Sequence, residues 1–417
     1  MSLLFPPRHH SATKHATRSR LFAGAAAAVA LFALGSSLSA ATSTSFPEIP
    51  ADYLQNAESI PDFWLSEVDA IEQYLAKNVK RGKVEVIGHT AGGRPIRAVA
   101  YGSPREGKGT TTFSGSLGFF DVRAFLGPDH AKKVFIGMGA VHGGEFEGIV
   151  GVMNLIAVLE TGRDLRGKEW PGIVAASKQV DRIVLIPIVN VDGRARIPLR
   201  MQPYCGTDNR YHTYFNTGVW KDGTRIGWPT VKEFIPLDFS RTQFPGGYPN
   251  DAGVNIQHDD FLGARQPETQ ALLDLASRER PDLIFNMHTG APPKNYFVRM
   301  HRPATEPALL PTFDDLYRAV HTALTQAGLQ STNDPAIEAT PPKTGSPRMN
   351  LDTALNLHCG VLSVLIESPS HSFAGVDRAG KVAKHTPEQL VDAHLVAFEA
   401  GLTFLGERGG RAQWALK

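Results

Sequence analysis

The chain has 417 residues, 42% of them hydrophobic, which is enough to build the core of one large domain or of two small ones. Its formal net charge is +2, and Lys and Arg are scattered along the chain, so there is no reason to expect a nucleic-acid partner. The composition is that of an ordinary globular protein.

The first 47 residues contain no acidic side chain, carry several basic ones and include an apolar run over 21–34. This pattern is typical of a secretory signal peptide, which we place at 1–40 and follow with a linker at 41–60. The apolar run is shorter than the ~20 residues of a membrane-spanning helix, so we expect no stable membrane insertion. We therefore expect a secreted or periplasmic protein, and the alternative is one anchored to the membrane by an uncleaved signal.

Export would permit a disulfide bond between Cys205 and Cys359, the only two cysteines of the chain. Two unlinked thiols are equally consistent with the sequence.

After the linker we expect one catalytic domain over 61–406 and a C-terminal tail over 407–417. Helical spacing of apolar residues predicts a helix over 62–77. The strand-like segments 84–88 and 96–101 flank turn residues, which predicts a hairpin. Residues 103–131 are glycine-rich and weakly periodic, which indicates a long surface loop or a small insertion.

The central stretch of the chain is an apolar run over 134–141, followed by a helical pattern over 149–159. His142 and Glu145 lie on the turn between the predicted strand and helix. Open α/β sheets place their functional sites at the carboxyl ends of strands, and a His-x-x-Glu turn offers a nitrogen and an oxygen to one zinc ion. A His-x-x-acid pair is common by chance. Only the residues at the ends of the later strands can show whether this pair binds zinc.

Three more apolar runs predict buried strands, and each of them ends in a polar residue. The strand over 182–190 ends in Asn190, the strand over 281–288 in His288, and the strand over 361–367 in Glu367. Helical patterns over 267–278, 311–327 and 387–405 alternate with these strands, as in an α/β fold.

Residues 194–250 are rich in glycine, proline and aromatic rings and show no sustained period. This composition favours a folded insertion that covers a site. The alternative is an insertion that only packs on the surface.

Three predicted strands end at His142, His288 and Glu367, and Glu145 follows just beyond the first. This placement would bring four side chains that can bind a metal or transfer a proton to one edge of the sheet. Two histidines and one carboxylate form a ligand set for catalytic zinc, and a second carboxylate suits a general base. A buried strand that ends in a glutamate is costly unless that carboxylate is paired or functional.

These motifs resemble those of the zinc carboxypeptidases of the carboxypeptidase A type, from about Trp64 to Leu405. The resemblance rests on five segments in order: Ile87–Ile96, Val141–Glu145, Asn190–Gly193, Pro267–Thr269 leading to Asn286–His288, and Leu365–Ser368. It implies the family's mixed, mostly parallel eight-stranded sheet between helices. It also implies one zinc ion per chain on His142, Glu145 and His288, with Glu367 as the catalytic base.

The family places an arginine beyond the Asn-Val-Asp-Gly turn, where it faces the developing oxyanion. Arg194, Arg196, Arg200 and Arg241 compete for that role, and we favour Arg196. We expect Arg194 and Arg241 to contact the substrate.

The sequence departs from the family where an Asn-Arg pair clamps the terminal carboxylate of the substrate. In the corresponding segment, which begins Gly253-Val254-Asn255, the pair reads Gln257-His258. We expect Asn255, Gln257 and His258 to line the substrate site. Because histidine offers a single donor and is mostly neutral at pH 7, we expect a poor carboxypeptidase on unblocked peptides. The family's tyrosine before the catalytic strand has no counterpart between Pro341 and Val361.

The predicted function is therefore that of an exported zinc-dependent hydrolase of peptide amide bonds. One alternative is a zinc amidase or deacylase that acts on small acylated amino acids or cell-wall peptides. A second alternative, a non-catalytic zinc-binding protein, is less well supported because all four chemically active residues are present.

Overall fold

The computed structural model describes residues 49–54, 58–107, 113–119, 121–227, 231, 236–290, 297–329, 349–376 and 381–414. The chain divides into two units, Met1–Thr42 and Ser43–Lys417, and every described residue belongs to the second. The predicted signal peptide and most of the predicted linker lie outside the described residues. Within the described part of the chain, no helix combines the length and the apolar character needed to cross a membrane.

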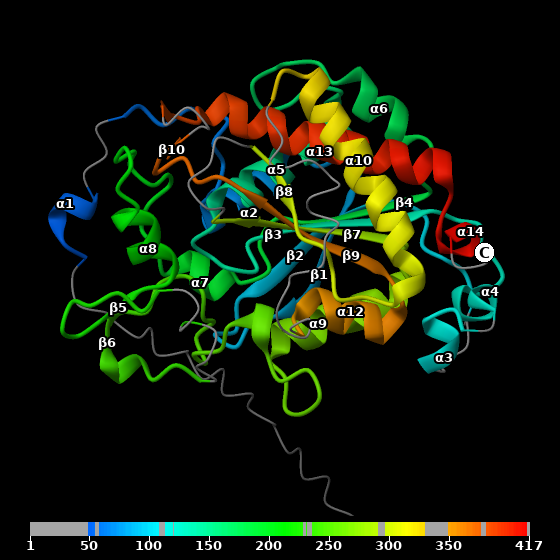
Figure 1. Ribbon diagram of the computed structural model, residues 1–417, viewed down its shortest axis with the longest axis horizontal. Helices are drawn as coiled ribbons and strands as arrows, with labels where there is room; N and C mark the ends of the chain where they lie inside the picture. Colours follow the sequence, from blue (N-terminus) through cyan, green and yellow to red (C-terminus); the bar gives the residue numbers. More distant parts are fainter. Residues whose placement is uncertain are drawn as a thin grey trace, which may run out of the picture. The chain divides into compact units, whose positions relative to one another are not determined.

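The main sheet of the second unit contains seven strands within the described residues (Figure 1). Their order is β1 (Lys83–His89), β2 (Pro95–Gly102), β4 (Arg182–Ile186), β3 (Val134–Gly139), β7 (Leu283–Thr289), β9 (Leu362–Ser368) and β8 (Arg299–Met300). The four strands from β4 to β9 are parallel, whereas the pairs β1–β2, β2–β4 and β9–β8 are antiparallel. The predicted mixed α/β sheet is confirmed, with seven strands in the described residues where we expected eight.

Two of the central strands end earlier than their apolar runs predict. Strand β3 ends at Gly139 because Ala140 adopts a φ of 49°, in the left-handed region that interrupts a strand. Strand β4 ends at Ile186 because Pro187 has no backbone N–H to donate to the ladder. The predicted hairpin is present as the antiparallel pair β1–β2.

Helices cover both faces of the sheet, as Figure 1 shows. The helices α5 (Phe146–Thr161), α6 (Pro171–Ser177), α10 (Leu310–Gln326) and α13 (Pro387–Arg408) contact one another on one face. The helices α9 (Pro267–Glu279) and α12 (Leu351–Cys359) cover the other face, where α9 lies against β1 and α12 against β9. This three-layer arrangement buries both faces of the parallel strands, which explains why their sequences are continuous apolar runs.

The first long helix, α2 (Val68–Asn78), begins later than the predicted 62–77. The backbone before it forms a turn at 62–63 and no helix, and its carbonyl groups accept hydrogen bonds from arginines that are distant in sequence. Arg200 Nε donates to Trp64 O at 3.0 Å, and Arg194 Nε donates to Ser66 O at 2.8 Å. Periodicity in the sequence does not reveal these partners.

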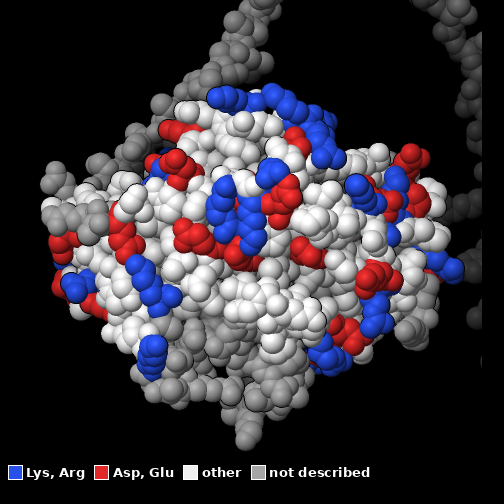
Figure 2. Space-filling model, turned by 90° about the horizontal axis from the view of Figure 1, so that it is seen from above, with Lys and Arg blue, Asp and Glu red and all other residues white. Residues whose placement is uncertain are grey.

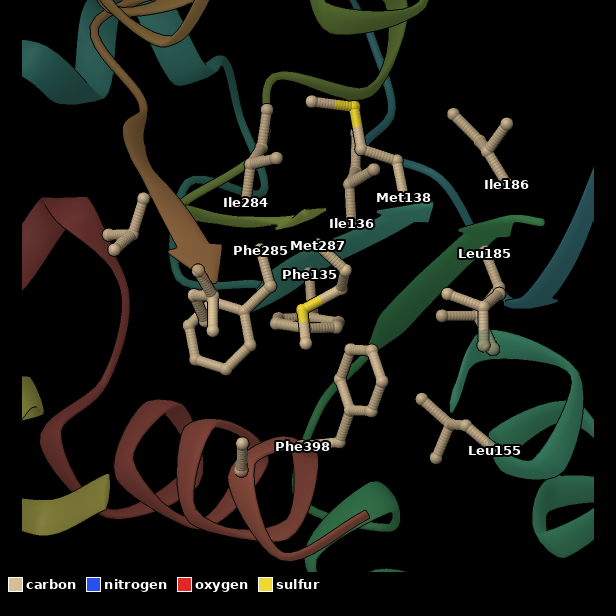
Figure 3. Packing of buried hydrophobic residues seen from close by; sticks show 14 of the residues in the cluster. Phe135, Ile136, Met138, Leu155, Leu185, Ile186, Ile284, Phe285, Met287 and Phe398 are labelled. Carbon is tan, nitrogen blue, oxygen red and sulfur yellow. The ribbon is translucent and has the colours of Figure 1, made fainter. Parts of the chain in front are cut away.

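Aromatic rings from strands and helices meet in the core (Figure 3). The ring of Phe135 on β3 lies edge-on to Phe285 on β7, with centroids 5.3 Å apart, and to Phe398 on α13 at 6.3 Å. Gly137 allows this close packing, because a Cβ atom there would lie 3.0 Å from Leu185 and 3.2 Å from Phe398.

Shorter elements fill the connections between the main strands and helices. They are α1 (Ala51–Leu54), α3 (Phe113–Ser116), α4 (Val122–Leu126), α7 (Val191–Ala195), α8 (Arg210–Asn216), β5 (Val219–Trp220), η2 (Phe239–Arg241), β6 (Thr242–Phe244), η3 (Ile256–His258), η4 (Pro307–Leu309), β10 (Gly375–Val376), β11 (Val382–Ala383) and α14 (Arg411–Trp414). The described part of the insertion at 194–250 is therefore folded, and the expected tail takes part in the packed fold up to Trp414, whose side chain is buried.

The two cysteines are free thiols, so the alternative of an unlinked pair holds in the structure. Basic and acidic side chains are interspersed over the face drawn in Figure 2. The mixture of charges on this face agrees with the scattered positions of Lys and Arg in the sequence.

Candidate zinc site

The candidate site forms where the parallel strands β3, β7 and β9 end side by side. His142 and Glu145 follow β3 on the turn into α5, and His288 lies in the last part of β7. In the register of β7 and β9, His288 lies directly opposite Glu367. The sheet therefore brings together the four residues that the sequence predicted to meet.

His142, Glu145 and His288 form a buried group whose ligand atoms all lie within 4.8 Å of one another. The Nδ1 atom of His142 is 2.8 Å from Glu145 Oε1, and the Nδ1 atom of His288 is 3.0 Å from Glu145 Oε2. Each of the three side chains is at least 96% buried. Two imidazole nitrogens and a carboxylate are the donor set of a catalytic zinc site.

Asn255 determines which nitrogen of His142 carries a proton. Its Oδ1 atom accepts a hydrogen bond from the backbone N–H of Gln257, so this atom is an acceptor. Because the same oxygen lies 3.1 Å from His142 Nε2, that nitrogen must donate to it. In the neutral ring, Nδ1 then presents its lone pair to the Glu145 carboxylate, an arrangement that requires a cation or a proton between them. These residues fit a zinc ion.

The carboxylate of Glu145 is held by further donors besides the histidines. Asn216 Nδ2 donates to its Oε1 at 3.2 Å, and the backbone N–H of Thr289 donates to its Oε2 at 3.0 Å. Burial opposes ionisation, but when the imidazoles of His142 and His288 are protonated, their charges and hydrogen bonds outweigh it and hold the pKa of Glu145 below its ordinary value. The chain thus maintains an ionised ligand in a buried position.

The two glycines between His142 and Glu145 allow three chain segments to meet at the site. A Cβ atom on Gly143 would lie 2.1 Å from Arg194 N, and one on Gly144 would lie 2.8 Å from Phe215 O. Gly143 N donates to Gly247 O at 2.8 Å. Side chains at these positions would separate the first zinc motif from the insertion that covers it.

Glu367 lies beside the metal ligands and is half-buried. Its Oε2 atom is without a hydrogen-bond partner among the described residues. Burial and the negative charge of Glu145 raise the pKa of Glu367 to about 7, although the charges of His288 and Arg299 oppose this rise. A carboxyl group with such a pKa exchanges protons readily near neutral pH.

Three residues of the insertion also reach the site, and we did not predict them. The ring of Tyr248 stacks on His142 with centroids 3.6 Å apart and an angle of 6°. On α8, Asn216 contacts Glu145, and His212 lies one turn earlier with its Nε2 atom 3.4 Å from Asn216 Nδ2. The richness of the insertion in aromatic rings was the only indication in the sequence that it covers the site.

His212 and Glu367 both border Gly290. A Cβ atom on this glycine would lie 3.5 Å from His212 Nε2 and 3.8 Å from Glu367 Oε2. Burial lowers the pKa of His212 to about 4, against the opposing charge of Glu145, so the ring is neutral at pH 7.

The segment expected to contact the substrate lies partly inside the protein. Asn255 supports His142, as described above. Gln257 uses both ends of its amide in a buried network: Nε2 donates to Asp352 Oδ2 at 2.9 Å, and Oε1 accepts from Asn286 Nδ2 at 3.2 Å. His258 is half-buried at the end of η3.

The candidate arginines form contacts with backbone carbonyls and with rings. Arg194 is fully buried, donates to the carbonyls of Ser66, Ile197 and Leu199, and lies over the ring of Phe146. Arg196 donates to Gly246 O and Pro249 O and pairs with Asp251 at 2.8 Å. The other two also contact residues outside the metal group, since Arg200 donates to Trp64 O and the exposed Arg241 lies over the ring of Trp220. These contacts hold the insertion and the N-terminal segment in place.

Comparison with solved structures supports the fold. A protein from Shewanella denitrificans, provisionally named a carboxypeptidase A, is 15% identical with a TM-score of 0.50, and the match covers 84% of this chain and 72% of that one. A metallo-carboxypeptidase from Burkholderia cenocepacia is also 15% identical, with a TM-score of 0.48 and coverage of 82% and 70%. At this identity, the likeness to the Shewanella denitrificans protein shows a shared fold and no more. A search of curated proteins found no match for this chain.

The model of the zinc carboxypeptidase family matches residues 68–346, which contain the three candidate ligands. This match spans more than half of the chain. The chain belongs to the zinc carboxypeptidase family and is a zinc metallopeptidase, and His142, Glu145 and His288 form its candidate metal site.

Proposed function

We propose that this protein is an exported hydrolase that cleaves an amide bond in a peptide or peptide-like substrate, with Glu367 as its general base. The observation that carries the proposal is the register of β7 and β9, which sets Glu367 directly opposite the metal ligand His288. A zinc ion bound at the site supplies Lewis-acid polarisation of the scissile carbonyl and activation of a water molecule.

In this proposal Glu367 accepts a proton from the attacking water. It then donates that proton to the amide nitrogen as the C–N bond breaks, so the products are a carboxylic acid and an amine. The general base must take up and release a proton in one cycle, and burial together with the negative charge of Glu145 raises the pKa of Glu367 in the direction that favours its protonated form. Tyr248 and α8 cover the site from the insertion and exclude bulk water from the buried ligands.

The composition of residues 1–40 supports export, with a cleaved signal peptide or an uncleaved one that anchors the protein. A zinc amidase or deacylase remains the second candidate function. It is favoured by the segment Asn255–His258, where Gln257 is occupied inside the protein and His258 replaces the arginine that would clamp a terminal carboxylate.

The test is an assay of the zinc-loaded protein on C-terminal, internal and N-acyl amides. Cleavage of peptide bonds supports the peptidase, and cleavage of N-acyl amino acids alone supports the deacylase. If the protein cleaves none of these amides, the proposal is wrong.

A further inference from the structure

Three polar residues lie in one row across the end of the sheet. Glu367 on β9 is opposite His288 on β7, and on its other side it is opposite Arg299 on β8. Residues that are directly opposed in neighbouring strands project from the same face of a sheet. Arg299 therefore starts from the same face as the candidate base and the metal ligand.

His301 extends this row. Its backbone N–H donates to Leu365 O at 2.9 Å, which continues the β8–β9 ladder beyond Met300. Because it follows Arg299 by two residues, it lies on the same face. Its Nε2 atom is 3.8 Å from Glu367 Oε1, which confirms that face.

The spacing of the strands allows Arg299 to contact a bound substrate. Neighbouring strands are about 4.8 Å apart, so the backbone of Arg299 lies roughly 10 Å from that of His288. A substrate chain advances about 3.3 Å per residue, so a group one or two residues from the scissile bond lies within reach of the arginine side chain.

Three of the residues predicted to contact the substrate are held by partners inside the protein. Asn255 is bound to His142, and Gln257 is bound to Asp352 and Asn286. Arg194 donates to buried carbonyls. The positive charge on the strand beside Glu367 comes from Arg299 on β8, and β8 is not among the five segments that resemble the family.

We propose that Arg299 is a specificity-determining residue that binds a carboxylate group of the substrate next to Glu367, with His301 beside it. The inference rests on the proposed function, because it concerns the same site. A guanidinium binds a carboxylate through two parallel hydrogen bonds, which fixes its orientation as well as its position. The carboxylate belongs either to the C-terminus of the substrate or to an acidic side chain, and acidic peptides carry both.

The test uses three pairs of blocked dipeptides in which one member has a carboxylate and the other an amide. Benzoyl-Gly-Phe and its C-terminal amide test the terminal carboxylate. Benzoyl-Gly-Glu-amide with benzoyl-Gly-Gln-amide tests an acidic side chain after the scissile bond. Benzoyl-Glu-Phe-amide with benzoyl-Gln-Phe-amide tests one before it. The pair that shows a preference identifies the source of the carboxylate.

We expect the zinc-loaded parent to favour the carboxylate member of at least one pair by about tenfold to a hundredfold in kcat/KM. Arg299→Gln should remove this preference, mainly by raising KM for the charged substrate, and should lower kcat/KM far more for the charged member of the pair than for the neutral one. Arg299→Lys should keep part of the preference, because lysine retains the charge without the planar fork.

Arg302→Gln is the matched control, since Arg302 follows the row of Arg299 and His301 in the chain and pairs with Asp314 of α10. It should leave the preference intact. The inference is wrong if the parent shows no preference in any pair, or if Arg299→Gln lowers kcat/KM equally for both members. Equal loss would mean that Arg299 acts only on Glu367.

A binding measurement separates this inference from the proposed function. If the parent cleaves none of the six compounds, the proposed function fails, and calorimetric titration with the same pairs still tests Arg299. Tighter binding of the charged member, lost in Arg299→Gln, supports the inference. Equal binding of both members of every pair overturns it.

Discussion

Asn216 donates a hydrogen bond of 3.2 Å from its Nδ2 atom to Oε1 of Glu145, the carboxylate that both histidines of the metal site approach. Asn216 is 1% exposed and ends α8, so the covering insertion directly orients a metal ligand. The insertion therefore contributes to the candidate metal site as well as covering it.

Asn216→Ala should weaken zinc binding by about 10- to 100-fold, the usual effect of removing a residue that orients a ligand. Competition with a chromophoric chelator measures this affinity. Asn209→Ala, at the start of the same helix, is the control and should bind zinc as the parent does. Equal affinity of Asn216→Ala and the parent would show that the hydrogen bond does not support the metal.

Glu367→Gln should keep the zinc and the fold but lose roughly a hundredfold or more in turnover, since general-base catalysis contributes about 10²–10⁴. The change is nearly isosteric, so substrate binding should persist. Turnover and zinc content are measured on the same preparation. Near-normal turnover, with amide hydrolysis established for the parent, would place the base elsewhere.

The fold and the four central site residues were predictable because each strand of the parallel centre is a continuous apolar run that ends in a polar residue. The strand register then sets their positions. Because β7 pairs with β9, His288 and Glu367 are neighbours. The contributions of Tyr248 and Asn216 were not predictable. They come from an irregular segment whose path depends on close backbone contacts at Gly143 and Gly144, for which there is no periodic pattern.

The contacts of the arginines were also not predictable from the sequence, but for a different reason. Arg194 looks like a substrate contact in the sequence, because it follows the Asn-Val-Asp-Gly turn. In the structure its donors meet the carbonyls of Ser66, Ile197 and Leu199, and only three-dimensional proximity reveals such partners. Arg299 was overlooked because its neighbour in space, Glu367, is distant in the sequence.

His394 should make the stability of the protein depend on pH. It is 1% exposed on α13 against Gly151 of α5, and burial lowers its pKa to about 4 despite a hydrogen bond of 2.7 Å to Leu390 O. The unfolded chain has the higher pKa, near ~6.5, so it takes up the proton first as the pH falls. The neutral ring therefore contributes stability above about pH 6.5 that is lost progressively toward pH 4.

Urea unfolding of the parent and of His394→Gln at about pH 7 and about pH 5 measures this contribution. The parent should lose roughly 2 kcal/mol more than the variant between the two conditions. His89→Gln, which changes an exposed histidine on β1, should behave as the parent. If the parent and His394→Gln lose the same free energy of unfolding, the predicted role of His394 is wrong.

The most direct test of the zinc assignment is the metal content of the purified protein and of His288→Ala, with zinc affinity measured for both. The parent should contain one zinc ion per chain, and His288→Ala should lose stoichiometric zinc because one of its two imidazole ligands is missing. His301→Ala, which removes a histidine of the same face that is not among the three ligands, should keep the metal. If His288→Ala retained one zinc ion per chain with the affinity of the parent, the metal site that we assign would be wrong.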